Sequence, residues 1–364
     1  MLKVVVDVPY WSIRRNNTDW KYTRYAFSRL SEKIPVEFYY LKDTERFFLE
    51  SLRFASDRIG SKIFGCDNEQ SYCRERDTLA FMRGIDRISP DIIYSHDSVS
   101  TCSEVPILWH HAYVDPEMCE SRGFDGETLL QLKNKHMEAA GKVSRILNNS
   151  DVQLKRHKET FDEFSGKYIS APFYMPHLPD TVSLKRFDFS KGSVKIKMLF
   201  VGREANRKGL KVVLDALNKI DYSRYELTVV SDFTDGYFDL SEYPFDIIYY
   251  ESLSFYQVRE LLAESHVFIM PSFFESYGFV FIEAMAAGCI IVAPDWEIQK
   301  EMVGGIGFCV KPNEKDVSCV LNSILDCSLA ELNQMVEIAT ERYNDVYSPS
   351  VVSKNYLRIF EGMI

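Results

Sequence analysis

The sequence lacks several features that would assign it to a class at once. None of its eight cysteines forms a C-x-x-C pair, so the spacing predicts neither a zinc site nor a disulfide framework and favours a reduced, cytoplasmic protein. No run of about 18 uncharged apolar residues occurs, which argues against a transmembrane helix. The apolar start is too short for a signal peptide, because Asp7 ends it. We therefore expect any membrane contact to be peripheral, at the inner face.

The charge also limits the partners. The 364 residues carry a net charge of −10, which argues against indiscriminate binding to nucleic acid. Residues 1–150 hold 21 Lys and Arg against 22 Asp and Glu, so most of the negative charge lies in the remainder. A nearly neutral first part is compatible with contact to an anionic membrane surface.

Apolar strand-like segments alternate with helix-like segments along the whole chain, which predicts mainly parallel sheets. Prolines break this rhythm between Ala171 and Gly192, and the length favours two domains over one. The expected strands are 2–6, 36–41, 91–95, 106–110, 144–148, 167–170, 197–201, 226–230, 246–250, 266–270 and 289–293. The expected helices include 20–33, 44–64, 76–87, 126–141, 208–220, 255–264, 314–325, 329–344 and 349–362.

Two carboxylates, Glu275 and Glu283, follow one of these strands and lie eight residues apart. Gly278 stands between them, where a helix begins. The first N–H groups and the dipole of a helix favour an anion, and a glycine lets a ligand approach the backbone closely. Glu283 could accept hydrogen bonds from a ribose diol and Glu275 from sugar hydroxyls. Taken alone, either glutamate could equally be a capping or surface residue.

A basic loop follows another strand. The segment Leu199-Phe-Val-Gly202-Arg203 precedes Arg207-Lys208-Gly209 and the start of a helix. Arg203 and Lys208 lie one loop apart, so both could reach one diphosphate, the first by bidentate donation and the second as a mobile point charge. Arg207 could point to solvent.

Together these segments resemble the E-x7-E and F-V-G-R…K-G patterns of retaining glycosyltransferases of family 4, the group 1 glycosyltransferases. The resemblance is dense over residues 196–312 and covers only the layout of the first domain. It implies the GT-B fold, an α/β architecture with two Rossmann-like doubly wound domains facing across a cleft. The implied parts are an acceptor-binding domain (1–172), a linker or domain edge (173–195), a nucleotide-sugar-binding domain (196–345) and a C-terminal helix crossing back to the first domain (346–364).

The resemblance also implies roles for particular residues. The catalytic candidates are His96, Arg203, Lys208 and Glu275, where His96 would position the donor or stabilise an oxocarbenium-like state. The donor-binding candidates are Arg203, Lys208, Ser252, Leu253, Glu275, Ser276, Tyr277, Gly278, Phe279 and Glu283. The acceptor-side candidates are Tyr10, Arg24, His110 and His111. The remaining histidines, at 136, 157, 177 and 266, are interpreted as structural.

The sequence departs from the family in two places. Ser252 stands where glycine is usual and Tyr250 where phenylalanine is usual, in the segment that reads the nucleotide base. The segment Val8–Trp11 replaces a Gly-Gly loop, and no glycine occurs before Gly60. Thr23-Arg24-Tyr25 resembles a variant of some mannosyltransferase-like members. These departures leave a non-catalytic sugar-nucleotide-binding subunit as an alternative.

The expected function is retaining transfer of a hexosyl unit from a UDP- or GDP-linked sugar to a glycan or lipid-linked acceptor, in cell-surface polysaccharide or lipopolysaccharide synthesis. No D-x-D occurs, the motif with which GT-A enzymes hold a metal, so we expect no required metal or cofactor. No nucleophile is evident, which suggests front-face attack. The enzymatic alternatives are a nucleotide-sugar epimerase and a sugar phosphorylase, the latter typically longer and dependent on pyridoxal phosphate.

Overall fold

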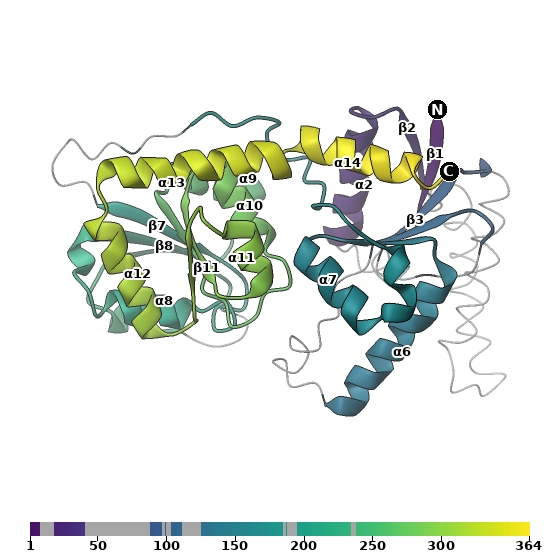
Figure 1. Ribbon diagram of the computed structural model, residues 1–364. Coiled ribbons are helices and arrows are strands. Elements are labelled where there is room, and N and C mark those ends of the chain that lie inside the picture. Colours follow the sequence, from purple (N-terminus) through teal and green to yellow (C-terminus); the bar gives the residue numbers. More distant parts are fainter. Residues whose placement is uncertain are drawn as a thin grey trace, which may run out of the picture. The chain divides into compact units, whose positions relative to one another are not determined.

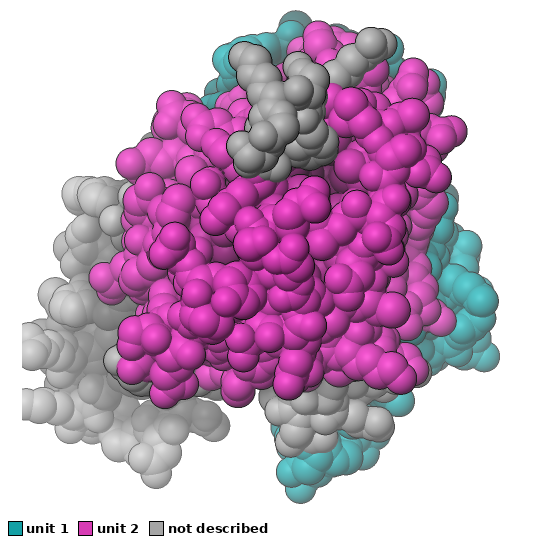
Figure 2. All heavy atoms as spheres, turned by 90° about the vertical axis from the view of Figure 1, so that its left-hand side faces the viewer, with its two compact units in different colours: residues 1–116, 124–176, 352–364 teal, residues 117–123, 177–351 magenta. Residues whose placement is uncertain are grey.

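The structure is a computed structural model that describes residues 1–7, 18–40, 88–96, 99, 103–110, 125–184, 187, 195–233 and 238–364, with the side chains of 18–23 left aside. The chain divides into two compact units, distinguished in Figure 2. Unit 1 comprises residues 1–116, 124–176 and 352–364, and unit 2 comprises residues 117–123 and 177–351. No helix among the described residues is both long enough and apolar enough to span a membrane.

Unit 1 is built on a six-stranded parallel sheet (Figure 1) with the order β2-β1-β3-β4-β5-β6. Its strands are β1 Leu2–Asp7, β2 Val36–Tyr40, β3 Ile92–His96, β4 Ile107–His110, β5 Arg145–Asn148 and β6 Tyr168–Ser170. Its helices include α2 Thr18–Ser31, α6 Gly126–Lys142, α7 Asp151–Thr160 and the 3-10 turn Asp162–Lys167. The side chains of Asp125 and Ser150 cap the first turns of α6 and α7, which satisfies backbone donors that those turns leave unpaired.

Unit 2 contains a second six-stranded parallel sheet with the order β12-β11-β10-β7-β8-β9. Its strands are β7 Ile196–Val201, β8 Tyr225–Val230, β9 Ile247–Tyr250, β10 Val267–Ile269, β11 Ile290–Pro294 and β12 Phe308–Val310. Its helices are α8 Leu210–Leu217, α9 Phe255–Glu264, α10 Phe279–Ala286, α11 Glu297–Val303, α12 Glu314–Asp326 and α13 Leu329–Arg342, with the turns Tyr222–Arg224, Leu240–Glu242 and Tyr343–Tyr347. The central strands are apolar and buried on both faces, as in sheets covered by helices on each side.

The strand order of unit 2 reverses between β7 and β10. Chain order runs outward from β7 through β8 to β9 on one side, and from β10 through β11 to β12 on the other. In open α/β sheets, ligands bind outside the carboxyl ends of the strands at such a switch point. The loops that follow β7 and β10 are therefore where a binding site is expected in unit 2.

The last helix, α14 Pro349–Glu361 (Figure 1, yellow), contributes to the core of unit 1. Val352, Tyr356 and Phe360, spaced one helical turn apart, are fully buried or nearly so in a cluster with residues of β1, β2, β3 and α2. Phe360 packs edge-on against Phe38 of β2 with ring centroids 6.1 Å apart. The assignment of the two units to an acceptor and a donor stays a prediction.

The predicted fold class, two Rossmann-like α/β domains, is confirmed: each expected strand is present within one residue at either end. Two elements were missed, α11 and β12. Both are short, seven and three residues, which is too few for a hydrophobic period to stand out in the sequence. The expected helices at 44–64 and 76–87 lie outside the described residues.

Candidate functional site

Unit 2 has a cavity of about 450 Å³ at the carboxyl ends of β7 and β10, next to the switch point. This volume falls in the usual range of small-molecule sites. Its walls are formed by Val201, Gly202, Arg203, Arg207, Lys208, Phe255, Val258, Met270, Glu275, Ser276, Gly278, Phe279, Val280 and Glu283. Seven of the ten donor-binding candidates thus lie around one cavity.

Lys208 is the most enclosed cation of this site. Its side chain is 13% exposed, and its Nζ forms an ion pair with Oε2 of Glu275, which is 9% exposed. The pair is possible because residue 202 is glycine: a Cβ there would lie 2.9 Å from Cγ of Lys208. Gly202 therefore lets the lysine stem pass across the end of β7 into the cavity.

Arg203 is the most exposed cation of the same wall. Its side chain is 83% exposed, and its Nε donates to Oδ2 of Asp232, beyond β8, over 2.7 Å. An exposed pair of this kind contributes little to stability, so an anionic ligand could recruit this guanidinium at small cost. The next residue, Glu204, has a φ of 57°, an uncommon value for a residue other than glycine.

The side chain of Arg207 does not point to solvent but connects two loops of the cavity wall. Its Nε donates to Oε2 of Glu204 over 2.8 Å, and its Nη1 donates to the carbonyl of Phe274 over 2.9 Å. The backbone N–H of Phe273 in turn donates to the carbonyl of Arg207 over 2.9 Å. These contacts tie the basic loop to the loop that carries Glu275.

Gly209 allows the same two loops to approach each other closely at a second point. It has a φ of 83°, and a Cβ there would lie 2.3 Å from the carbonyl oxygen of Pro271. Only glycine adopts this backbone conformation without cost and also leaves room for such a close approach. The loops after β7 and β10 therefore form one braced wall.

The helix α10 begins at the cavity with Gly278, whose φ is 88°. A Cβ there would lie 2.6 Å from Cδ2 of Phe281 and 3.3 Å from Cγ of Glu275, so glycine is required both by conformation and by space. The carbonyl of Tyr277 accepts a 2.8 Å hydrogen bond from Nε2 of the buried Gln299 on α11. This fixed helix start presents backbone donors suited to an anion.

Glu283 lies on the next turn of α10 and also lines the cavity. Its Oε1 is 3.3 Å from Nε2 of His177, and both side chains are mostly buried, 15% and 11% exposed. The sequence interpretation had set His177 aside as structural. The available signal was its place in the proline-rich segment between Ala171 and Gly192, which does not identify a partner.

Three predicted donor residues lie off the cavity wall. Ser252 and Leu253 are not among the lining residues, and Phe255 and Val258 of α9 take that side of the wall. The side chain of Tyr277 is buried, 4% exposed, and its carbonyl accepts the hydrogen bond from Gln299 that holds the start of α10. Tyr250, where the family has phenylalanine, is 38% exposed on β9.

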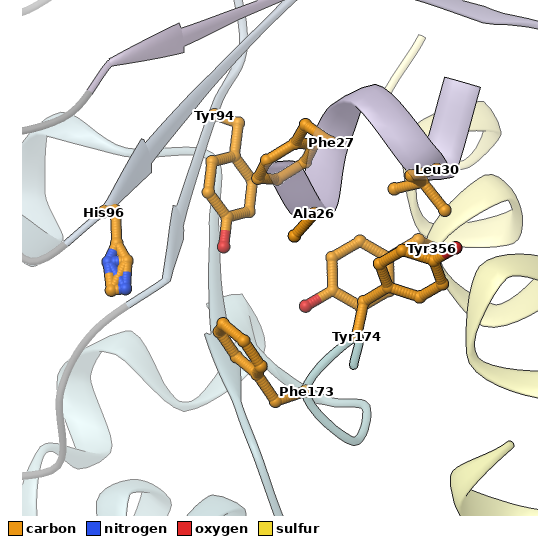
Figure 3. A pocket seen from close by; sticks show the side chains of 8 residues that line it. All are labelled: Ala26, Phe27, Leu30, Tyr94, His96, Phe173, Tyr174 and Tyr356. Atoms are coloured by element: carbon orange, nitrogen blue, oxygen red, sulfur yellow. The ribbon is translucent and has the colours of Figure 1, made fainter. Parts of the chain in front are cut away.

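Unit 1 brings His96 and His110 together at the ends of β3 and β4, with ring centroids 5.3 Å apart. His96 borders a cavity of about 10 Å³, drawn in Figure 3 with its aromatic lining. That space is about enough for one water molecule. The cavity itself therefore admits no sugar.

His110 is held by a chain of hydrogen bonds. Asn149 Oδ1 accepts from Nε2 over 2.8 Å, so Nδ1 must accept from the hydroxyl of Tyr94 over 2.5 Å. The hydroxyl of Tyr356 on α14 joins the chain through Tyr94 and through the backbone of Tyr174. Burial and the neighbouring His96 lower the pKa of His110 to about 3. His110 is therefore a neutral, 3% exposed group, which orients its neighbours.

The remaining candidates of unit 1 are more scattered. Arg24 is exposed on α2, and its guanidinium lies 5.4 Å from the ring centroid of Tyr40. Tyr10 and His111 lie outside the described residues, as does the segment that replaces the glycine loop. In the described part of the chain, no group of three or more His, Cys, Asp or Glu is placed to hold a metal ion.

Two doubly wound parallel sheets, the second with a cation- and carboxylate-lined cavity at its switch point, define the GT-B class of fold. Residues 195–326 match the family model described as Glycosyl transferases group 1. The predicted resemblance to group 1 glycosyltransferases is thereby confirmed, and it rests on the segment that builds the cavity.

Three curated relatives share part of the sequence. An "Uncharacterized 41.2 kDa protein in cps region" of Klebsiella pneumoniae is 26% identical over 46% of this chain and 47% of its own length. The "MMP alpha-(1->4)-mannosyltransferase" of Mycolicibacterium hassiacum is 33% identical over 33% and 30%. The "O-antigen chain mannosyltransferase B" of Escherichia coli is 34% identical over 20% and 19%. The chain thus spans less than half the length of each of these relatives.

Solved structures resemble the chain over its whole length. A glycosyltransferase from Rickettsia africae superimposes with a TM-score of 0.65 at 13% identity, covering 100% of this chain and 98% of that one. Anabaena HepE in complex with UDP and glucose gives a TM-score of 0.62 at 13% identity, with both chains covered fully. At this identity the likeness establishes the fold alone.

Proposed function

We propose that this protein is a retaining glycosyltransferase that moves a hexosyl unit from a nucleotide-diphospho-sugar to a glycan or glycolipid acceptor. The observation that carries the proposal is the cavity of unit 2, where Arg203, Lys208 and the start of α10 surround the same space as Glu275 and Glu283. Cations and helix N–H groups suit a diphosphate, and the carboxylates suit the hydroxyls of a ribose and a sugar.

The ion pair between Lys208 and Glu275 gives the proposal a mechanism. A bound diphosphate would take over the lysine charge, and a bound sugar would offer its hydroxyls to the glutamate. The ion pair would then be exchanged for two contacts with the donor. As the sugar–phosphate bond breaks, negative charge grows on the leaving phosphate, and Arg203 and Lys208 would stabilise that charge. Without an enzymic nucleophile, the leaving phosphate would accept the proton of the acceptor during front-face attack.

The relatives favour a product at the cell surface. One is a mannosyltransferase of an O-antigen chain and another an α-(1->4)-mannosyltransferase. The structural neighbour Anabaena HepE was solved in complex with UDP and glucose. We therefore place the donor among UDP- and GDP-linked hexoses, with mannose and glucose tested first. The acceptor would be served by unit 1, where Arg24 of α2 is an exposed acceptor-side candidate, at a cytoplasmic or membrane-peripheral location.

The first test is a thermal-shift panel with UDP, GDP, ADP and CDP and their common sugar conjugates. A ligand that binds the folded state raises its melting temperature by mass action. We expect a shift with one nucleotide base, lost in Glu283→Ala and Lys208→Ala. The absence of any shift in folded protein would favour a non-catalytic protein, and nucleotide-sugar conversion without an acceptor would favour an epimerase.

Transfer itself is tested with the donor so identified and membrane or glycan fractions as acceptor. We expect an α-linked product from an α-linked donor, read by NMR from the anomeric coupling of the product. Activity should persist in excess chelator. An inverted product, or activity lost in chelator and restored by Mn²⁺, would overturn the retaining, metal-independent mechanism.

A further inference from the structure

We propose that His177 positions Glu283 for binding the ribose of the donor. The inference rests on the proposed function and names a residue of the same site. His177 does not line the cavity, whereas Glu283 does, so the histidine would act through the glutamate. The contact is the 3.3 Å separation between Nε2 of His177 and Oε1 of Glu283.

The His177 ring is held in place from the side of α9. Phe255 packs edge-on against it, with ring centroids 4.5 Å apart and planes at 81°. The backbone carbonyl of His177 accepts a 3.2 Å hydrogen bond from Nη1 of Arg259, and this guanidinium also lies 5.8 Å from the ring centroid of Phe255. One turn of α9 therefore holds the residue by both its backbone and its ring.

The chain around His177 is also constrained. It follows Pro176 and precedes Pro179, and the carbonyl of Pro179 accepts a 2.5 Å hydrogen bond from the hydroxyl of Tyr343. Proline limits its own backbone and that of the residue before it. The imidazole thus comes from a stiff, anchored segment, which is what a positioning group requires.

Glu283 gains from such a partner because it is a largely buried carboxylate on a short helix. Within the residues that the structure describes, His177 is the one basic side chain at ion-pair distance from it. The pair lacks the alignment of a full hydrogen bond, and contacts of this kind often tighten only when substrate binds. With Oε1 held by the histidine, both oxygens keep lone pairs for a vicinal diol.

The cluster of Phe255, His177 and Glu283 would connect the base and the ribose of a bound nucleoside. Phe255 lies on the cavity wall and against His177, and His177 lies against Glu283. If a nucleoside diphosphate contacts both Phe255 and Glu283, then His177 would affect its binding through each of these residues. The predicted effect is selective for the ribose hydroxyls, because these are the groups that Glu283 would accept from.

The test compares UDP and GDP with their 2′-deoxy forms, by calorimetric titration of the full chain. The wild type should prefer the ribonucleotide. His177→Ala should reduce that preference about fivefold to tenfold, which is the loss expected for one hydrogen bond of ordinary strength. His177→Gln, which keeps a donor near the position of Nε2, should restore most of it. In a double-mutant cycle with Glu283→Gln, the two effects should not add.

Controls separate this inference from stability and from the proposed function. His266→Ala removes a histidine of the same unit whose Nδ1 accepts from the backbone of Lys197, so it should lower the melting temperature but leave the ribose preference unchanged. An unchanged preference in His177→Ala, an equal loss for both sugars, or additive effects in the cycle would overturn the positioning role. Failure of the wild type to bind any nucleotide would instead overturn the proposed function.

Discussion

The carboxyl edges of the two sheets carry different chemistry on the same architecture. In unit 2, ionisable side chains and two glycines, Gly202 and Gly278, line a cavity of about 450 Å³. In unit 1, the cavity at the corresponding edge measures about 10 Å³ and is lined mainly by aromatic and aliphatic side chains. The loops around the unit 2 cavity also depend on glycine, since a Cβ at Gly202, Gly209 or Gly278 would lie too close to a neighbouring atom. A doubly wound sheet therefore supplies a place for a site, and the strand-end residues decide its chemistry.

The sharpest way to test this contrast is to remove a charge from the unit 2 edge. We expect Lys208→Ala to lower kcat/KM by about 100- to 1,000-fold, because the growing phosphate charge would lose a preorganised cation. Steady-state kinetics with the identified donor measures it. The matched control is Lys211→Ala, which removes the same charge from the exposed pair with Asp215 and should change kcat/KM less than about twofold. Equal losses in both variants would contradict a local role.

The braced wall is tested through Gly209. We expect Gly209→Ala to lower the free energy of unfolding by about 2–4 kcal/mol, because it adds both a positive-φ strain and a clash with the carbonyl of Pro271. Gly305→Ala is the matched control: its φ is also positive, at 80°, but a Cβ there meets nothing within 4 Å. It should cost about 1 kcal/mol by urea unfolding. Similar costs at both positions would mean that the close approach is relieved easily.

Acid should destabilise the unit 1 side. Burial lowers the pKa of His136 to about 4 and of His157 to about 3, as it does for His110. Between their unfolded value near 6.5 and these folded values, the unfolded state binds more protons, so stability falls as the pH falls. We expect about 1 kcal/mol for each histidine between pH 7 and 5.5. The measurement is urea unfolding across this range, with hydrogen exchange to locate the opening in unit 1. A flat profile would argue that these rings stay protonated or exposed.

The smallest expected effect tests the hydrogen-bond chain of unit 1. Tyr356→Phe keeps the ring in the core but removes the hydroxyl that meets Tyr94 and the backbone of Tyr174. We expect a loss of about 1 kcal/mol in unfolding free energy and no change in nucleotide affinity. Tyr25→Phe, on a 45% exposed tyrosine of the same unit, should be neutral. Altered nucleotide affinity in Tyr356→Phe would show that this chain of hydrogen bonds influences donor binding.

Sequence reasoning was strongest where the signal is local. The strands were predicted from contiguous apolar runs, and the cavity was anticipated because its residues fall in two short segments, around Gly202 and around Gly278. It was weaker wherever a residue depends on a distant partner. The sequence left the direction of Arg207 open, and the structure shows that its side chain donates to the carbonyl of Phe274. Ser252 and Leu253 were expected at the cavity, but α9 takes that side of the wall.

The sequence by itself determined the alternation of strands and helices, the two segments of the cavity and the resemblance to group 1 glycosyltransferases, because each is written in neighbouring residues. Only the tertiary structure decided that His177 meets Glu283, that Lys208 pairs with Glu275, and that His110 is buried and neutral. These outcomes depend on which backbones approach each other and which side chains lose contact with water. Burial and pairing arise from long-range packing, so no local pattern encodes them.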